Sequence, residues 1–115
     1  MKKIARRFKG HEFWDPNNTR YDLRLLTRPI HRYSDPKSGL LDGGVFVFTH
    51  ATNPEIYLFV EALSKDGKPT TWQYAAARTA SSEVHVELDG RDVWREVRAG
   101  RIRPTDRFWL FYAAP

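Results

Sequence analysis

The sequence of 115 residues contains no cysteine, and this absence excludes disulfide bonds, thiolate metal sites and catalysis by a thiol. No apolar run approaches the roughly 18 residues that a membrane-spanning helix needs, so we expect no membrane partner. The basic residues at the start are followed by no apolar stretch, and we therefore expect no signal peptide and a cytoplasmic location. The sequence also has no internal repeat, no phosphate-binding glycine loop and no nucleophile elbow.

What the chain does contain is enough for one folded domain over residues 1–115. Domains typically span roughly 100–150 residues, and a chain of this length buries roughly two thirds of its unfolded surface. Four Trp, five Tyr and seven Phe supply large side chains for a core. Residues 1–20 carry many Lys and Arg, so a partly extended basic arm is an alternative for this segment.

Short alternating segments between turns rich in Gly, Pro and Asp predict strands rather than long helices. The expected strands cover residues 6–14, 21–25, 45–49, 56–62, 72–79, 84–88, 91–97 and 107–113. The first of these could instead belong to the arm, and residues 91–97 could form a short amphipathic helix. We therefore predict an all-β or β-rich α+β fold, a small antiparallel meander of about six to seven strands closed as a barrel or sandwich.

One segment, residues 54–64, carries signals for both a strand and a helix. Asn53 could cap a helix, Pro54 could occupy its first position and Gly67 could end it. Ile, Tyr, Phe and Val favour a pleated strand, however, so we expect a strand here. Residues 34–39 are rich in turn formers and predict an exposed loop, and the Asp-Gly pairs at 66–67 and 89–90 predict hairpin turns.

Residues 84–88 show the clearest alternation in the chain. The apolar side chains expected to point into the core are Val84, Val86 and Leu88. The polar side chains expected on the opposite face are Glu83, His85 and Glu87. Together with His50, such a set could hold zinc or ferrous iron. The simpler interpretation is the polar outer face of an amphipathic strand, and on this basis no metal and no cofactor is predicted.

The net charge of +5 is unevenly distributed along the chain. Residues 1–39 hold ten Lys or Arg and four Asp or Glu, residues 40–90 hold three and seven, and residues 91–115 hold six and three. If the two basic ends share one face, they could bind nucleic acid or another anionic polymer. The residues expected in such a surface are Arg6, Arg7, Phe8, Trp14, Arg101 and Arg103. The alternative is that the basic ends cover the acidic middle or only solubilise the surface.

Aromatic residues recur at alternate positions of three expected strands. They are Phe46 and Phe48, Tyr57 and Phe59, and Trp72 and Tyr74. Exposed, these rings would form a stacking platform for bases, but a domain this small needs its large side chains inside, so we expect them in the core. Residues 107–113 are apolar on both faces, which fits a central strand or the interface of a homodimer.

A small pocket is the second functional hypothesis. Glu61 lies in an apolar segment, where a buried carboxyl group could act as a general acid, whereas an ion pair with Arg78 would make it structural. The residues of this alternative pocket are His50, Glu61, Arg78 and His85. We predict a non-catalytic binding or assembly module, with an anionic polymer as the favoured partner. The alternatives are a small β-barrel enzyme or ligand-binding protein, and a homo-oligomeric assembly protein without ligand.

Overall fold

The structure, a computed structural model, describes residues 1–98 and the backbone of residues 111–113. Strands dominate this part of the chain. The elements are α1 (Lys2–Ala5), β1 (Phe8–Phe13), β2 (Tyr21–Asp22), β3 (Arg24–Leu25), β4 (His31–Asp35), the 3-10 turn η1 (Pro36–Ser38), β5 (Leu40–His50), β6 (Asn53–Leu63), β7 (Thr71–Arg78), β8 (Glu83–Leu88), β9 (Arg91–Glu96) and β10 (Phe111–Ala113). None of the helices in the described residues is long and apolar enough to cross a membrane.

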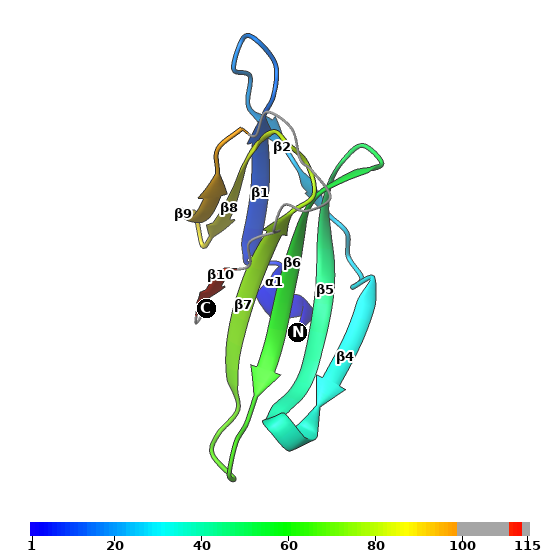
Figure 1. Cartoon of the computed structure of the whole chain (residues 1–115), viewed down its shortest axis with the longest axis vertical. Coiled ribbons are helices and arrows are strands. Elements are labelled where there is room, and N and C mark those ends of the chain that lie inside the picture. The colour runs from blue at the N-terminus through cyan, green and yellow to red at the C-terminus, as the bar shows by residue number, and fades with distance from the viewer. Residues whose placement is uncertain (99–110, 114–115) are drawn as a thin grey trace.

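The strands form two antiparallel sheets (Figure 1). The smaller sheet has the strand order β2-β1-β8-β9. The larger has the order β10-β7-β6-β5-β3, and β4 pairs with the same long strand β5 as β3 does. The mostly-β, antiparallel prediction is therefore confirmed. Within residues 1–20, the segment of the alternative basic arm, β1 lies between β2 and β8.

The core lies between the two sheets. Its buried cluster joins Phe8, Val84 and Val86 of the small sheet to apolar side chains of the large one. The Phe8 and Tyr74 rings meet directly, with centroids 4.8 Å apart. Gly10 allows the sheets to approach, because a Cβ atom there would lie 2.9 Å from the Phe48 ring. The inward direction predicted for the apolar residues of 84–88 is confirmed.

Three local expectations differ from the structure. Residues 21–25 are not one strand, because the chain passes between the sheets at Leu23, whose N–H donates to the carbonyl of Gly10 at 2.8 Å. Residues 31–35 form β4 where part of a loop was expected, because β5 begins at Leu40 and offers them a partner. The described residues contain ten strands rather than six to seven. Residues 54–63 do form a strand as expected, as part of β6 (Asn53–Leu63).

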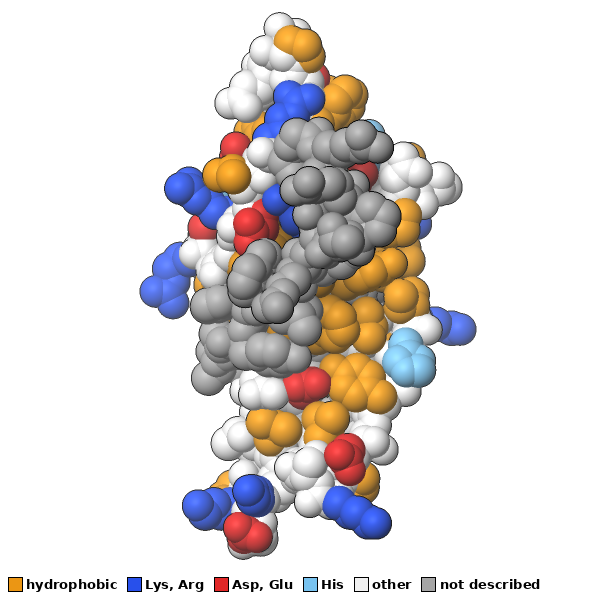
Figure 2. Space-filling model, viewed as in Figure 1, with side chains coloured by type: hydrophobic (Ala, Val, Ile, Leu, Met, Phe, Trp, Pro, Cys, Tyr) orange, Lys and Arg blue, Asp and Glu red, His pale blue; other side chains and the backbone are white. Residues whose placement is uncertain are grey.

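The outer face of the large sheet is apolar around its middle. The side chains that share it by register are Val45, Val47, Tyr57, Phe59, Ala75 and Ala77. Figure 2 shows hydrophobic side chains gathered over the middle of β5 and β6. Phe46, Phe48 and Tyr74 lie in the core as predicted, whereas Tyr57 and Phe59 are half-buried on this outer face. Both faces of β6 are therefore largely apolar, which explains why the hydrophobic pattern of this segment did not distinguish a strand from a helix.

Candidate functional site

A cleft of about 280 Å³ lies where the ends of β1, β5 and β6 approach the segment that joins β7 to β8. The residues that line it and carry polar or aromatic groups are Glu12, Trp14, His50, Asn53, Glu55, Ser81 and Ser82. None of the described residues lining the cleft is Lys or Arg. Although the chain has a net charge of +5, the described lining of this cleft contains two acidic residues, Glu12 and Glu55, and no basic Lys or Arg.

Two carboxyl groups meet at the base of this cleft. Glu12 follows Phe8 and Gly10 on the inner face of β1 and is only 1% exposed. Its Oε2 accepts a hydrogen bond from the Ser82 hydroxyl at 3.0 Å. Glu55 is hydrogen-bonded to Glu12, and burial, followed by the charge of Glu12, raises the pKa of Glu55 to about 7. The pair therefore retains a proton near neutral pH.

An aromatic wall borders the same cleft. The Trp14 ring stacks on Tyr21 with centroids 4.9 Å apart, and Trp14 remains 43% exposed. His50 meets both rings edge-on, and its Nδ1 lies 3.8 Å from Oε1 of Glu12. The Tyr21 hydroxyl donates to Asp15 at 2.8 Å, which holds the ring that supports Trp14. Tyr21 is thus held by Asp15, while Trp14, which packs on it, remains partly exposed beside the cleft.

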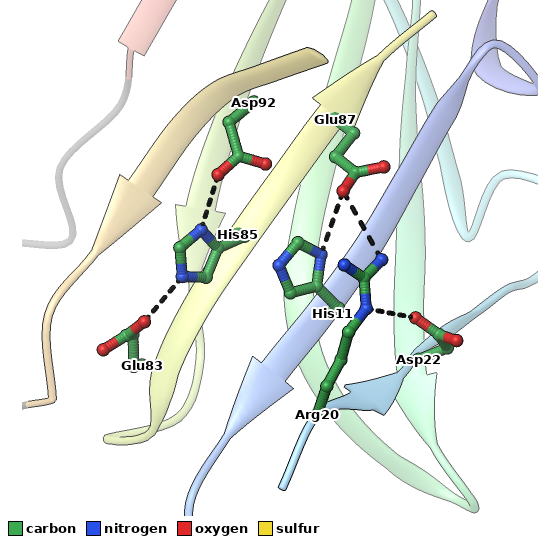
Figure 3. A network of polar contacts seen from close by, with 7 residues as sticks. All are labelled: His11, Arg20, Asp22, Glu83, His85, Glu87 and Asp92. Carbon is green, nitrogen blue, oxygen red and sulfur yellow. Dashed lines mark hydrogen bonds and ion pairs between the residues drawn. The ribbon is translucent and has the colours of Figure 1, made fainter. Parts of the chain in front are cut away.

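A second cluster lies on the outer face of the small sheet (Figure 3). His11 of β1 and His85 of β8 are directly opposite in register. Their rings stack with centroids 4.5 Å apart and an angle of 9° between planes. Although both point away from the core, His11 is 4% exposed and His85 is 6% exposed. The expected outward direction of His85 is right, but the ring is not solvated.

Both ring nitrogens of His85 face carboxylates. Nδ1 lies 2.9 Å from Oδ2 of Asp92 on β9, and Nε2 lies 2.7 Å from Oε2 of Glu83 on the same strand as His85. A neutral imidazole donates through only one nitrogen. A neutral ring therefore donates to one of the two carboxylates, and the other, being partly exposed, is open to water or to a cation.

His11 is held less completely. Its Nδ1 is buried and has no hydrogen-bond partner, and the nearest carboxylate oxygen, Oε1 of Glu87, is 3.5 Å away. Glu87 is also bound by Arg20, which donates to Asp22 at 3.0 Å. Burial lowers the pKa of His11, and the positive charge of Arg20 lowers it further. This histidine is therefore neutral at neutral pH and keeps a free lone pair.

The structure describes four of the residues expected to bind an anionic polymer, and their surroundings differ. Arg6 is exposed, while Arg7 forms a two-point ion pair with Asp89. Trp14 is exposed, but it lies on the acidic cleft. Phe8 does not belong to a binding surface, contrary to expectation. Its ring is 2% exposed and lies in the core, where no base can stack on it. Arg101 and Arg103 lie outside the described residues.

The four residues of the alternative pocket do not meet either. Glu61 lies on the outer face of the large sheet, where Tyr33 O–H donates at 2.8 Å and Gln73 N–H donates at 2.6 Å. Arg78 lies at the other end of the β6–β7 pair and donates to the carbonyls of Ala80, Ser82 and Val97. His85 is on the small sheet, and only His50 lines the cleft.

Sequence reasoning missed Glu12, Glu55 and Ser82 in the cleft, and His11 and Asp92 beside His85. The strand period places Glu12 on the same face as Phe8, which was a usable signal for burial. The pairing of His11 with His85 depends on the register between β1 and β8, which are separated by most of the chain. No local pattern carries that information.

Comparison with known proteins found no match: no family model, no curated protein and no solved structure matches the chain.

Proposed function

We propose that the protein is a non-catalytic binding domain that holds a small cationic ligand, a primary ammonium, in the acidic cleft. The observation that carries the proposal is the hydrogen-bonded Glu12–Glu55 pair in a cleft whose described lining contains no Lys or Arg. A cleft with a few convergent polar groups and a group of shifted pKa is the usual place for a ligand.

An ammonium group fits the two carboxyl groups chemically. It offers three donors and no acceptor, so it can bridge Glu12 and Glu55 where one proton now holds them together. Ser82 keeps its own hydrogen bond to Oε2 of Glu12 in this arrangement. Because Glu12 is almost fully buried, its charge is poorly solvated and gains most from a cationic partner.

The aromatic wall supports the same ligand charge. One face of Trp14 packs on Tyr21, and the residue keeps 43% of its surface exposed beside the cleft. Trp is the aromatic side chain that attracts cations most strongly, by roughly 0.5–2 kcal/mol depending on how far the cation is desolvated. A ligand with an ammonium group and an apolar body would meet both the carboxylates and this ring.

The test compares benzylamine with benzyl alcohol, which has nearly the same shape but no charge. We expect benzylamine to bind more tightly, with the largest NMR shifts at the Trp14 indole and at Asn53. Glu55→Gln should weaken benzylamine binding by about tenfold or more, because hydrogen bonds to charged groups contribute roughly 1.5–3 kcal/mol.

Glu61→Gln is the matched control, since it removes a buried strand glutamate outside the cleft and should leave the affinity unchanged. Equal binding of the alcohol, or equal affinity of the Glu55→Gln and native proteins for benzylamine, would contradict the proposal.

The other expectations stay predictions. The exposed side chain of Arg6 is what supports an anionic polymer as partner among the described residues, together with the net charge of +5. Two facing sheets that share one core support a sandwich over a closed barrel. A homodimer through residues 107–113 and a cytoplasmic location also stay predictions.

A further inference from the structure

We propose that His11, His85 and Asp92 form a binding site for Zn²⁺, or a divalent transition-metal ion of similar preference, on the outer face of the small sheet. Each residue offers one ligand atom, and these atoms all lie within 4.8 Å of one another. The site is independent of the cleft, because the side chains of His11 and Glu12 leave β1 on opposite faces.

The sheet register brings the three ligands together. His11 and His85 are opposite each other on β1 and β8, and β9 pairs with the other edge of β8. The ladder between β8 and β9 shifts register between Val86 and Glu87, and Asp92 reaches His85 at 2.9 Å beside this irregularity. Such shifts re-aim side chains next to functional sites.

Carboxylates stand behind both histidines, as they do in many metal sites. With Nδ1 of His85 directed at Asp92, Nε2 is left to donate to Glu83 at 2.7 Å. A histidine that binds a metal usually donates its other N–H to a carboxylate, which fixes the ring and raises its basicity. Glu87 stands in the same relation to Nδ1 of His11, at 3.5 Å, and Figure 3 shows the other nitrogen of His11 on the side of His85.

The nitrogen of His11 that lacks a hydrogen-bond partner, Nδ1, faces Glu87, so Nε2 is the ring atom available to a metal. The His11 side chain is 5% exposed, and yet Nδ1 has no hydrogen-bond partner. Buried polar groups without partners are rare in proteins, and a small turn of the ring would pair Nδ1 with Glu87. A metal held by His11 would give the ring a strong interaction and allow Nδ1–H to close on Glu87.

Binding requires a small rotation of one ring. The two imidazoles are nearly parallel, so their lone pairs lie in parallel planes and do not converge on one point. The terminal torsion of a histidine side chain has a broad energy well, and His11 has no hydrogen bond at Nδ1 to lose on turning. His85 is held at both nitrogens, so His11 is the ring that moves.

The donor set selects the class of metal. Two imidazoles and one carboxylate suit Zn²⁺, which commonly takes three protein ligands and leaves a fourth position open. Mg²⁺ and Ca²⁺ prefer sites built of oxygen and would bind poorly here. Figure 3 draws four carboxylates and Arg20, and by register Lys9 and Arg95 share the same face, so acidic groups still outnumber basic ones there.

The test is a titration of the whole protein with ZnCl₂, followed by calorimetry and by the NMR signals of the imidazole nitrogens. We expect one ion per chain, shifts at His11 and His85, and no shift at His31 or His50, which act as internal controls. Asp92→Asn should weaken binding about tenfold or more. Glu83→Gln should weaken it roughly 10–100-fold while leaving all three ligands in place.

Asp92 is half-exposed, so its replacement tests the site without depending on a core position. His31→Ala removes an exposed histidine of β4 and is the matched control, for which we expect unchanged affinity. The proposal is overturned if Zn²⁺ does not bind, if Mg²⁺ binds as tightly, or if Zn²⁺ shifts His31 or His50 instead of the stacked pair. Unchanged affinity in Asp92→Asn would also overturn it.

Discussion

Both faces of the β1–β8 pair hold buried side chains, but they are buried by different means. On the inner face Val86 is 0% exposed and packs with Phe8 and side chains of the other sheet. On the outer face His85 is 6% exposed, and it is covered by His11, Glu83 and Asp92. Burial alone therefore does not mark the core of this protein.

This difference shows what each face demands of its residues. Apolar burial is non-directional, so the inner face tolerates many combinations of similar volume. A buried polar network requires that each donor meets an acceptor, since an unsatisfied group costs about 1–3 kcal/mol. The described part of the outer face leaves one such group, Nδ1 of His11, without a hydrogen-bond partner.

The largest expected effect is on the inner face. Phe8→Ala should lower the free energy of unfolding by about 3–5 kcal/mol, because it removes a buried ring that contacts Tyr74 and leaves a cavity. Urea unfolding measures this change. Trp14→Ala is the control, since that ring is 43% exposed and should cost far less. A loss below about 1 kcal/mol at Phe8 would place the ring at the surface and restore it as a binding residue.

The direct comparison of the two faces is Val86→Ala against His85→Ala. Val86→Ala should cost about 1–3 kcal/mol through lost burial and a residual cavity. Periodicity alone predicts a small cost at His85. The structure predicts a larger cost of about 1–3 kcal/mol, because the His85 ring is buried and packs on His11 and Phe13, so its removal leaves a cavity. Equal stability of the native protein and His85→Ala would show that the outer network contributes nothing to folding.

Much of the fold followed from local pattern. Alternation placed β8 and its inward face, and the Asp-Gly pairs marked the turns after residues 63 and 88, where Gly67 and Gly90 adopt positive φ. Strand β4 was missed because only Tyr33 of its five residues is half-buried, so an edge strand without an apolar face left little pattern. The passage of the chain between sheets at Leu23 depends on tertiary contacts.

The candidate sites were less accessible from the sequence. His50 and His85 were named, but their true partners come from other strands. Glu12 lies beside Glu55 because β1 and β6 belong to facing sheets, and His11 lies beside His85 because of register. In both pairs the two residues are far apart in the sequence, whereas hydrophobic periodicity gives information only about residues that are close in sequence.

The inner face of β1 ends at a polar residue, Glu12, which is coupled to Glu55 of β6. The pH dependence of stability tests this coupling. The folded protein retains the Glu55 proton up to about pH 7, whereas the unfolded chain releases it near its usual pKa of 4.5. This contribution to stability is therefore complete below about pH 4.5 and is lost as the pH rises through about 7. Glu55→Gln stays neutral at every pH, so its stability should fall less than that of the native protein over this window.

Urea midpoints at several pH values across this window measure the difference between the two proteins. Glu61→Gln is the control, because Glu61 is bonded to Tyr33 and Gln73 away from the cleft and should leave the slope unchanged. Identical pH profiles for the native protein and Glu55→Gln would show that Glu55 does not share a proton with Glu12.

The smallest stability effect is expected outside both faces, at Arg6 and Arg7. Arg7→Ala breaks an exposed ion pair with Asp89 and should lower the free energy of unfolding only slightly, and Arg6→Ala should lower it less. Because both variants remain folded, they test the anionic-polymer hypothesis cleanly against labelled single-stranded RNA. If both residues contact phosphates, each replacement should reduce the log–log salt slope by roughly 0.7. Since Arg7 is already paired with Asp89, we expect the larger change at Arg6, and no change at either would remove this end of the chain from the polymer surface.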